Sequence, residues 1–363
     1  MSQKITYRQV IDRLEENDLP YGTLTLQNGV TIVVSRRGGR IFGPFLTQDD
    51  GPDSESIFWI NDVFADPDAF ERFLESGDWN LGGSRIWIAP EIQYHVRDRE
   101  DFWGTVYWPS QVDPGNYTLE NPRPNQWLLS QDMTLQAYNI ASGEKELHLE
   151  RLIRRAEDPL RNVSGYEDLV EGHSGGTLFA GYEQSITLSE QVNDGIMSEA
   201  WSLVQLHGGG ELVIPASPRV EFVDYYDPVG DLQTIHADHV RLQVTGQDQY
   251  KVGYKAAHVF GRLGYFHHLD DGRATLVVRN FFNNPARPYV EEPAHLPGQH
   301  GYSIHVYNDG GDFGGFGELE CNAQTIGGET GRSSSTDQLV LWLYVGVEEQ
   351  VKKIALHLLG VEI

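Results

Sequence analysis

Short runs of alternating apolar and polar residues fill most of the chain, and this period of two predicts β-strands. Residues 147–153 show the alternation until their last positions, and residues 23–27 and 30–34 flank Asn28-Gly29, a dipeptide typical of a two-residue hairpin turn. Turn-forming Gly, Pro, Asn and Asp separate the runs, which predicts stacked antiparallel sheets. Further strands are expected at residues 127–138, 147–154, 177–188, 200–206, 211–214, 240–244, 250–254, 274–279, 301–307 and 338–345.

Helices are expected at two places, both near the N-terminus. Residues 7–16 place apolar side chains on one face, and the second segment begins with Asp66 as N-cap and Pro67 in the first turn, and ends near Gly77. The stretch richest in Gly and Ser, residues 326–335, lies between two strand-like runs and is typical of a surface loop. We therefore expect an all-β protein with two short N-terminal helices, folded as one domain over residues 1–363.

Charge and composition exclude several classes of partner. The formal net charge is −26, which argues against nucleic acid and anionic membranes as partners. No apolar run reaches the roughly 18 residues of a membrane-spanning helix, and the first residues have no signal-peptide pattern, so a cytoplasmic protein is expected. The lone cysteine, Cys321, excludes an intrachain disulfide and is expected to be buried. No pattern predicts an oligomeric state.

Two patterns that suggest chemistry are set aside. Residues 172–176 (GHSGG) fit the nucleophile motif of serine hydrolases, but that motif needs a following helix, and a strand-like run follows here. The tightest histidine pairs are His236 with His239 and His267 with His268. On a regular strand each pair points to opposite faces, so neither is expected to chelate a metal. We expect no metal and no cofactor.

Three stretches resemble the galactose mutarotase-like (aldose 1-epimerase-like) superfamily, most closely its uncharacterised bacterial families. They are residues 38–41 (GGRI), 80–91 (NLGGSRIWIAPE) and 317–326 (GELECNAQTI). The resemblance implies a supersandwich of antiparallel strands with the site on a concave sheet face. It also implies that Glu320 is the catalytic base.

The chemistry that the resemblance implies is the opening and closing of a sugar ring at its anomeric carbon. One group must take the anomeric hydroxyl proton and another must protonate the ring oxygen. Glu320 is the candidate base, and His207 is the candidate acid. The family has an aromatic residue and Asn after this histidine, whereas here residues 208–210 are glycines, so His95 is a rival.

Other residues of the second stretch are candidates for binding a carbohydrate ligand. Arg85 offers a fixed fork of donors and Trp87 an apolar face for a sugar ring, and Asn80 and Glu91 complete the set. We expect Glu320, Arg85 and Trp87 to share one pocket. Two alternatives stay open: a non-catalytic carbohydrate-sensing or accessory protein, and a polysaccharide lyase or glycoside hydrolase on the same sandwich. A hydrolase would use Glu91 and Glu320 as its pair of carboxylates.

Overall fold

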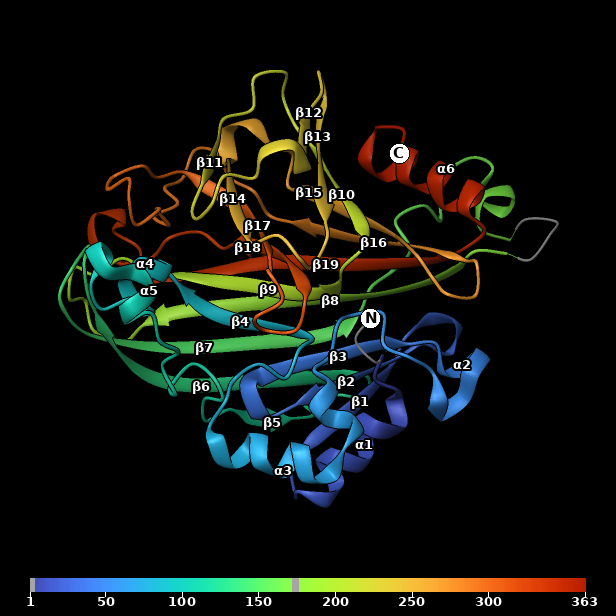
Figure 1. Ribbon diagram of the computed structural model, residues 1–363, viewed down its shortest axis with the longest axis horizontal. Helices are drawn as coiled ribbons and strands as arrows, with labels where there is room; N and C mark the ends of the chain where they lie inside the picture. The colour runs from blue at the N-terminus through green and yellow to red at the C-terminus, as the bar shows by residue number, and fades with distance from the viewer. Residues whose placement is uncertain (1–3, 172–175) are drawn as a thin grey trace.

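Two large β-sheets form the body of the protein (Figure 1). The computed structural model describes residues 4–171 and 176–363, so the GHSGG motif lies largely outside the described residues. Over these residues one sheet has nine strands and the other ten, and the strand pairs in both are antiparallel. The expected all-β antiparallel supersandwich is confirmed.

The strands of each sheet come from distant parts of the chain. In spatial order, the nine-stranded sheet consists of β1 (Tyr21–Thr25), β2 (Thr31–Ser35), β3 (Arg40–Phe45), β4 (Ser84–Ala89), β9 (Glu199–His207), β18 (Phe316–Asn322), β17 (Tyr302–Asn308), β14 (Tyr250–Lys255) and β11 (Phe222–Asp224). The ten-stranded sheet consists of β12 (Gln233–Ile235), β13 (His239–Val244), β10 (Gly210–Pro215), β15 (Arg262–His268), β16 (Ala274–Phe281), β19 (Ser334–Gly346), β8 (Leu178–Glu190), β7 (Gly143–Arg155), β6 (Gln126–Ala137) and β5 (Thr118–Glu120).

The two predicted N-terminal helices are present as α1 (Tyr7–Glu16) and α3 (Pro67–Ser76), capped by the side chains of Thr6 and Asp66. The structure adds α6 (Glu348–Leu359), a helix that the sequence reasoning missed. Its apolar face packs on the outer side of the ten-stranded sheet (Figure 1). Short helices occupy connections: α2 (Thr47–Asp50), α4 (Glu91–Tyr94) and α5 (Phe102–Thr105). Among the described residues, no helix is long and apolar enough to cross a membrane.

The alternation along β18 places carboxyl groups on one face of the sheet while their neighbours face the core. Leu319 and Cys321 belong to the main hydrophobic cluster, in which apolar residues of both sheets pack together. Burial raises the pKa of the Cys321 thiol to about 11, so this cysteine is an inert core residue, as expected. Because successive strand residues point to opposite faces, Glu318 and Glu320 lie on the other side of the sheet.

Two buried arginines of the ten-stranded sheet hold the strands of the nine-stranded sheet in place. Arg279 on β16 donates to the carbonyl and hydroxyl oxygens of Ser202 on β9 and to the carbonyl of Leu319 on β18. Arg151 on β7 donates to the hydroxyl of Ser84 on β4. These hydrogen bonds offset part of the cost of burying two cations. They also fix the relative positions of β4, β9 and β18, the strands that carry the candidate site.

Candidate functional site

A hollow of about 250 Å³ lies over the outer face of the nine-stranded sheet. Strand register explains why residues far apart in sequence meet there: Leu203 on β9 pairs with Arg85 on one side and with Glu320 on the other. Arg85 and Glu320 therefore lie in one row across three strands. The hollow is lined by side chains that include Trp79, Arg85, Trp87, Glu91, His95, Trp201, Tyr226, Lys251, Glu318 and Glu320.

Glu320 is a buried carboxyl group, with 1% of its surface exposed. The indole Nε1 of Trp201 donates a 2.9 Å hydrogen bond to its Oε2, and Lys251 Nζ lies 3.6 Å from the same oxygen. Burial raises the pKa of Glu320 to about 8, Glu318 and Glu91 raise it as well, and Lys251 and the Trp201 hydrogen bond act in the opposite direction. The carboxyl group therefore gains or loses its proton near neutral pH, which suits a general base or acid.

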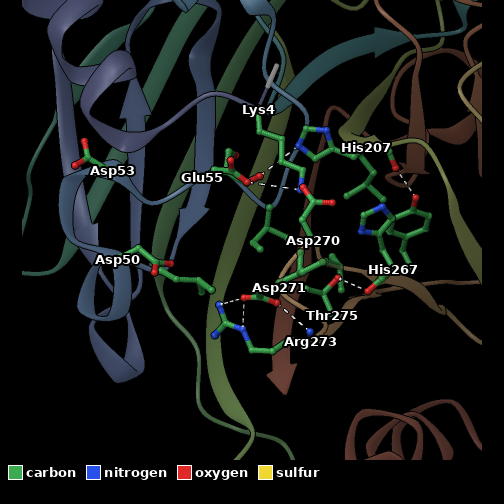
Figure 2. A pocket seen from close by; sticks show the side chains of 17 residues that line it. Lys4, Asp50, Asp53, Glu55, His207, His267, Asp270, Asp271, Arg273 and Thr275 are labelled. Atoms are coloured by element: carbon green, nitrogen blue, oxygen red, sulfur yellow. Dashed lines mark hydrogen bonds and ion pairs between the residues drawn. The ribbon is translucent and has the colours of Figure 1, made fainter. Parts of the chain in front are cut away.

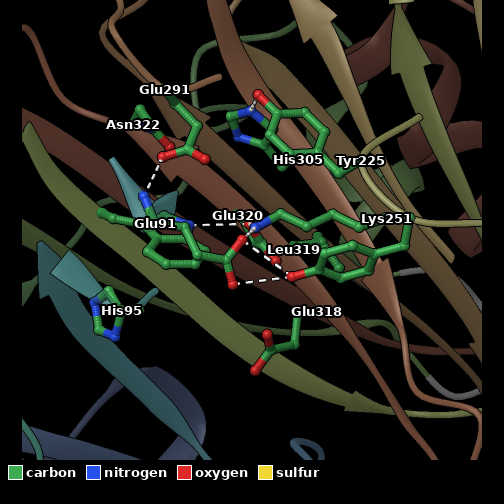
Figure 3. A network of polar contacts seen from close by, with 12 residues as sticks. Glu91, His95, Tyr225, Lys251, Glu291, His305, Glu318, Leu319, Glu320 and Asn322 are labelled. Carbon is green, nitrogen blue, oxygen red and sulfur yellow. Dashed lines mark hydrogen bonds and ion pairs between the residues drawn. The ribbon is translucent and has the colours of Figure 1, made fainter. Parts of the chain in front are cut away.

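Lys251 lies between two carboxylates, as Figure 3 shows. Its Nζ is 2.7 Å from Glu91 Oε2, and it lies over the Trp201 ring at 4.3 Å. Burial alone would lower the pKa of Lys251, but Glu320 and Glu91 raise it above its ordinary value, so the group stays an ammonium. Tyr226 fixes the far side of Glu91 by donating its hydroxyl hydrogen to that carboxylate, with distances of 2.9 and 3.0 Å to the two oxygens.

Arg85 is held between two tryptophan rings, with its guanidinium 4.9 Å from Trp79 and 4.1 Å from Trp87. Its Nη1 lies 2.8 Å from Glu318 Oε1, but the two atoms are not aligned as a hydrogen bond. The contact is a close ion pair. Buried polar groups rarely stay without partners, and within residues 4–171 and 176–363 the Arg85 Nε donor has no hydrogen-bond partner. A ligand hydroxyl oxygen would satisfy it.

His95 is the imidazole that lies in this hollow. Its ring stacks on Trp87 at 5.1 Å, and its Nε2 is 3.2 Å from the carbonyl oxygen of Ile88. A carbonyl only accepts, so Nε2 carries the hydrogen and Nδ1 is left as an acceptor, without a hydrogen-bond partner in the described structure. Burial lowers the pKa of His95 to about 4, so the ring is neutral at pH 7. It is placed to accept a hydrogen bond from a ligand hydroxyl rather than to donate a proton.

His207 does not lie in this hollow, which corrects the expectation that it stands beside Glu320. It lines a separate hollow of about 380 Å³ with Lys4, His267 and Asp270 (Figure 2), and its Nε2 is 3.3 Å from the carbonyl oxygen of Ser56. The physical reason is its place at the end of β9. That end lies four residues beyond Leu203, the register partner of Glu320, and four strand residues span about 13 Å.

Asn80 is a neighbour of the hollow rather than part of its lining. It is buried, accepts a hydrogen bond from Gln205 at 3.0 Å, and donates to the carbonyl oxygen of Phe313, which lines the hollow. Arg40, from the GGRI stretch, has a similar supporting place. It donates to the carbonyl of Trp79 and to Asp113, and Asp113 also accepts from the indole of Trp87 at 3.2 Å. Asn80 therefore supports the backbone at Phe313, and Arg40 supports the tryptophan walls.

Several lining residues were missed by the sequence reasoning: Trp79, Trp201, Tyr226 and Lys251. Lys251 had a readable signal, since it is one of only six lysines and stands between Tyr250 and Val252 in a strand-like run. The tryptophan and tyrosine contributions had none, because aromatic residues are common along the whole chain. In the described residues, no group of three or more His, Cys, Asp or Glu side chains is arranged to hold a metal ion.

The two antiparallel sheets form a supersandwich, the fold expected from the resemblance to galactose mutarotase-like proteins. A solved structure from Escherichia coli K12, provisionally described as an aldose 1-epimerase, is similar with a TM-score of 0.51 and 10% identity over 90% of this chain and 99% of that one. A galactose mutarotase-like protein from Lactobacillus casei ATCC 334 gives a TM-score of 0.45 and 10% identity over 90% of this chain and all of that one. At 10% identity, the similarity to the Escherichia coli structure shows a shared fold and nothing more. The TM-score of the Lactobacillus casei structure is below 0.5, so no conclusion rests on it.

The chain belongs to a family of unknown function, DUF6786, whose family model matches residues 6–363. No curated protein matches the chain by sequence.

Proposed function

We propose that the protein binds a sugar in the hollow lined by Trp79, Arg85 and Trp87 and interconverts its anomers, with Glu320 as the base. The observation that carries the proposal is the burial of Glu320, whose pKa is raised to about 8, in the same hollow as tryptophan faces and unpartnered polar groups. Aromatic faces pack on the C–H surface of a sugar ring. The Nε donor of Arg85 and the Nδ1 acceptor of His95 suit its hydroxyl groups.

The proposed reaction opens and closes the sugar ring. The ionised Glu320 removes the anomeric hydroxyl proton, that O–H electron pair forms the carbonyl bond, and the bond between the anomeric carbon and the ring oxygen breaks. Lys251 gives a proton to the ring oxygen and recovers one from Glu320, whose Oε2 is 3.6 Å from its Nζ. Closure on the other face of the carbonyl reverses these steps. Lys251 thus takes the part that the sequence reasoning gave to His207.

A second candidate is a protein that binds the sugar without catalysis. The position of His207 outside the hollow favours it, as does the neutral His95, because among the described residues that line the hollow no imidazole is placed to protonate a ring oxygen. The two candidates share a ligand and a site, and they differ only in whether a bound sugar changes anomer faster than it does in water.

An inverting glycoside hydrolase is supported less well. Glu91 Oε2 and Glu320 Oε2 lie 2.7 and 3.6 Å from the same Lys251 nitrogen. These two oxygens cannot be as far apart as the roughly 6.5–9.5 Å between the carboxyl groups of inverting glycosidases, which must leave room for a water. The ammonium also occupies the space between the two carboxylates.

A thermal-shift screen with a library of free monosaccharides tests the proposed site. A ligand that binds the folded state raises the melting temperature whether or not catalysis occurs. We expect at least one sugar to do so with the wild type and to lose the effect with Trp87→Ala. A matched control is Trp127→Ala, which removes a tryptophan outside the hollow. The proposal fails if no sugar raises the melting temperature, or if Trp127→Ala removes the effect as fully as Trp87→Ala.

A further inference from the structure

Three packed aromatic residues, Phe102, Trp103 and Tyr226, form an aromatic ledge beside the candidate sugar site. Trp103, on α5, is 57% exposed, and its ring lies 4.9 Å from both Phe102 and Tyr226. A single exposed apolar side chain is ordinary on a protein surface. Here three rings are packed together at the entrance of a hollow, so the exposed ring face of Trp103 is held in place rather than free.

The ledge joins the sugar hollow to a second hollow of about 570 Å³. Phe102, Trp103 and Tyr226 line both hollows. Tyr226 also connects the ledge to the chemistry below it, since its hydroxyl donates to Glu91, which contacts Lys251. A ligand that fills the inner hollow and extends outward therefore passes over Trp103.

The polar groups of the outer hollow select the kind of ligand that could extend there. They are Arg99, Glu100, Asp101 and His295. Arg99 is already paired with Glu292 at 2.5 Å and donates to the carbonyl oxygen of Ala294 at 3.1 Å. Two exposed carboxylates with a paired arginine give no surplus positive charge for a phosphate or a polyanion. An aromatic face beside mixed donors and acceptors fits a neutral sugar ring.

We propose that Trp103 forms a second sugar-binding subsite and that the ligand is a reducing di- or oligosaccharide. Its reducing-end ring occupies the inner hollow beside Glu320, because only that ring carries the anomeric hydroxyl on which Glu320 acts. The adjoining ring stacks on Trp103, with its hydroxyl groups toward the polar side of the outer hollow. This inference rests on the proposed function of the inner hollow and extends it to the size of the ligand.

Titration calorimetry with five defined sugars tests the subsite: glucose, galactose, maltose, cellobiose and lactose. We expect at least one disaccharide to bind the wild type at least tenfold more tightly than its reducing-end monosaccharide, glucose. Trp103→Ala should remove most of that gain, so that it weakens binding of the disaccharide far more than binding of glucose. The matched control is Phe260→Ala, which removes an aromatic ring that is 70% exposed and lies outside both hollows.

The possible failures are distinguishable. If monosaccharides bind and disaccharides bind no more tightly, the subsite is refuted while the proposed function stands. The subsite is also refuted if Trp103→Ala weakens monosaccharides and disaccharides alike. If none of the five sugars binds, the subsite is refuted. If the wider monosaccharide library also shows no binding, the proposed function is refuted as well. Sedimentation velocity adds a further check: a lower mass for Trp103→Ala than for the wild type would make the ledge a self-association surface.

Discussion

Replacing Glu320 by glutamine should stabilise the protein at neutral and mildly alkaline pH, and the gain should grow with pH. Burial holds the pKa of this carboxyl group at about 8 in the folded state, against 4.5 as its ordinary value. A group whose pKa is raised on folding contributes stability that is present below the unfolded pKa and is lost as the pH rises through the folded pKa. Glutamine resembles the protonated form at every pH, and its amide oxygen can still accept from Trp201.

The magnitude follows from the size of the shift. Each pKa unit corresponds to about 1.4 kcal/mol. Between pH 5 and pH 8 the wild type should therefore lose about 3 kcal/mol of folding free energy through Glu320, and the variant should lose none by this route. Lys251 keeps its closer partner in the variant, since Glu91 lies 2.7 Å away. Titrating groups that do not interact with Glu320 are common to both proteins and cancel in the difference, whereas Lys251 and Glu91 interact with it and contribute to the change.

Urea unfolding followed by tryptophan fluorescence, at several pH values from 5 to 8, measures the effect. The difference in unfolding free energy between Glu320→Gln and wild type should move in favour of the variant as the pH rises. Glu329→Gln, at an exposed carboxylate in a loop, is the matched control and should show no such trend. A difference that stays constant from pH 5 to pH 8 would refute the reasoning, because Glu320 would then ionise in the folded protein as it does in the unfolded chain.

Three further predictions concern catalysis and the scaffold. The rate of anomer interconversion should rise with pH through about 8 as Glu320 ionises. Lys251→Met should slow the reaction, because it removes the proposed acid, and should move the remaining rise to higher pH, because Lys251 lowers the pKa of Glu320; a pH–rate profile of both proteins measures this. His207→Gln should leave the interconversion rate within about twofold of wild type, since His207 lines another hollow, and a large loss in the same rate assay would return it to the site. Arg279→Ala should destabilise the protein by at least about 2 kcal/mol in urea unfolding, because buried oxygens of Ser202 and Leu319 lose a charged donor; unchanged stability would contradict its role between the sheets.

Much of the fold could be predicted because each strand has a local pattern of alternating apolar and polar residues, bounded by turn residues. The hairpin at Asn28-Gly29 is one example: both residues have positive φ, 51° and 65°, as the dipeptide predicts. The C-terminal helix α6 shows the limit. Its apolar residues are visible in the sequence. However, strand β19 ends at Gly346 and the helix begins at Glu348, so no turn residues separate the two elements, and the helix was not predicted.

The site residues that could be predicted from the sequence are those that lie in a recognisable stretch on a single strand. Glu320, Arg85 and Trp87 were expected to share a hollow, and they do, because β4 and β18 flank the same strand. The partner of Glu320 was not predictable in this way. Lys251 reaches it from β14, two strands beyond β18, and that neighbour relation depends on the order of strands in the sheet rather than on any local pattern.

Anomer exchange measured by two-dimensional NMR tests the central claim most directly. The sugar to use is the one that gives the largest thermal shift, and the α-to-β exchange rate is compared with wild type, with Glu320→Gln and without protein. The account predicts that wild type accelerates exchange and that Glu320→Gln still binds the sugar but loses about 10²–10⁴-fold in rate. If the wild type binds the sugar and leaves its exchange rate as it is in water, Glu320 is not a catalytic base, and the protein is a sugar-binding protein without this activity.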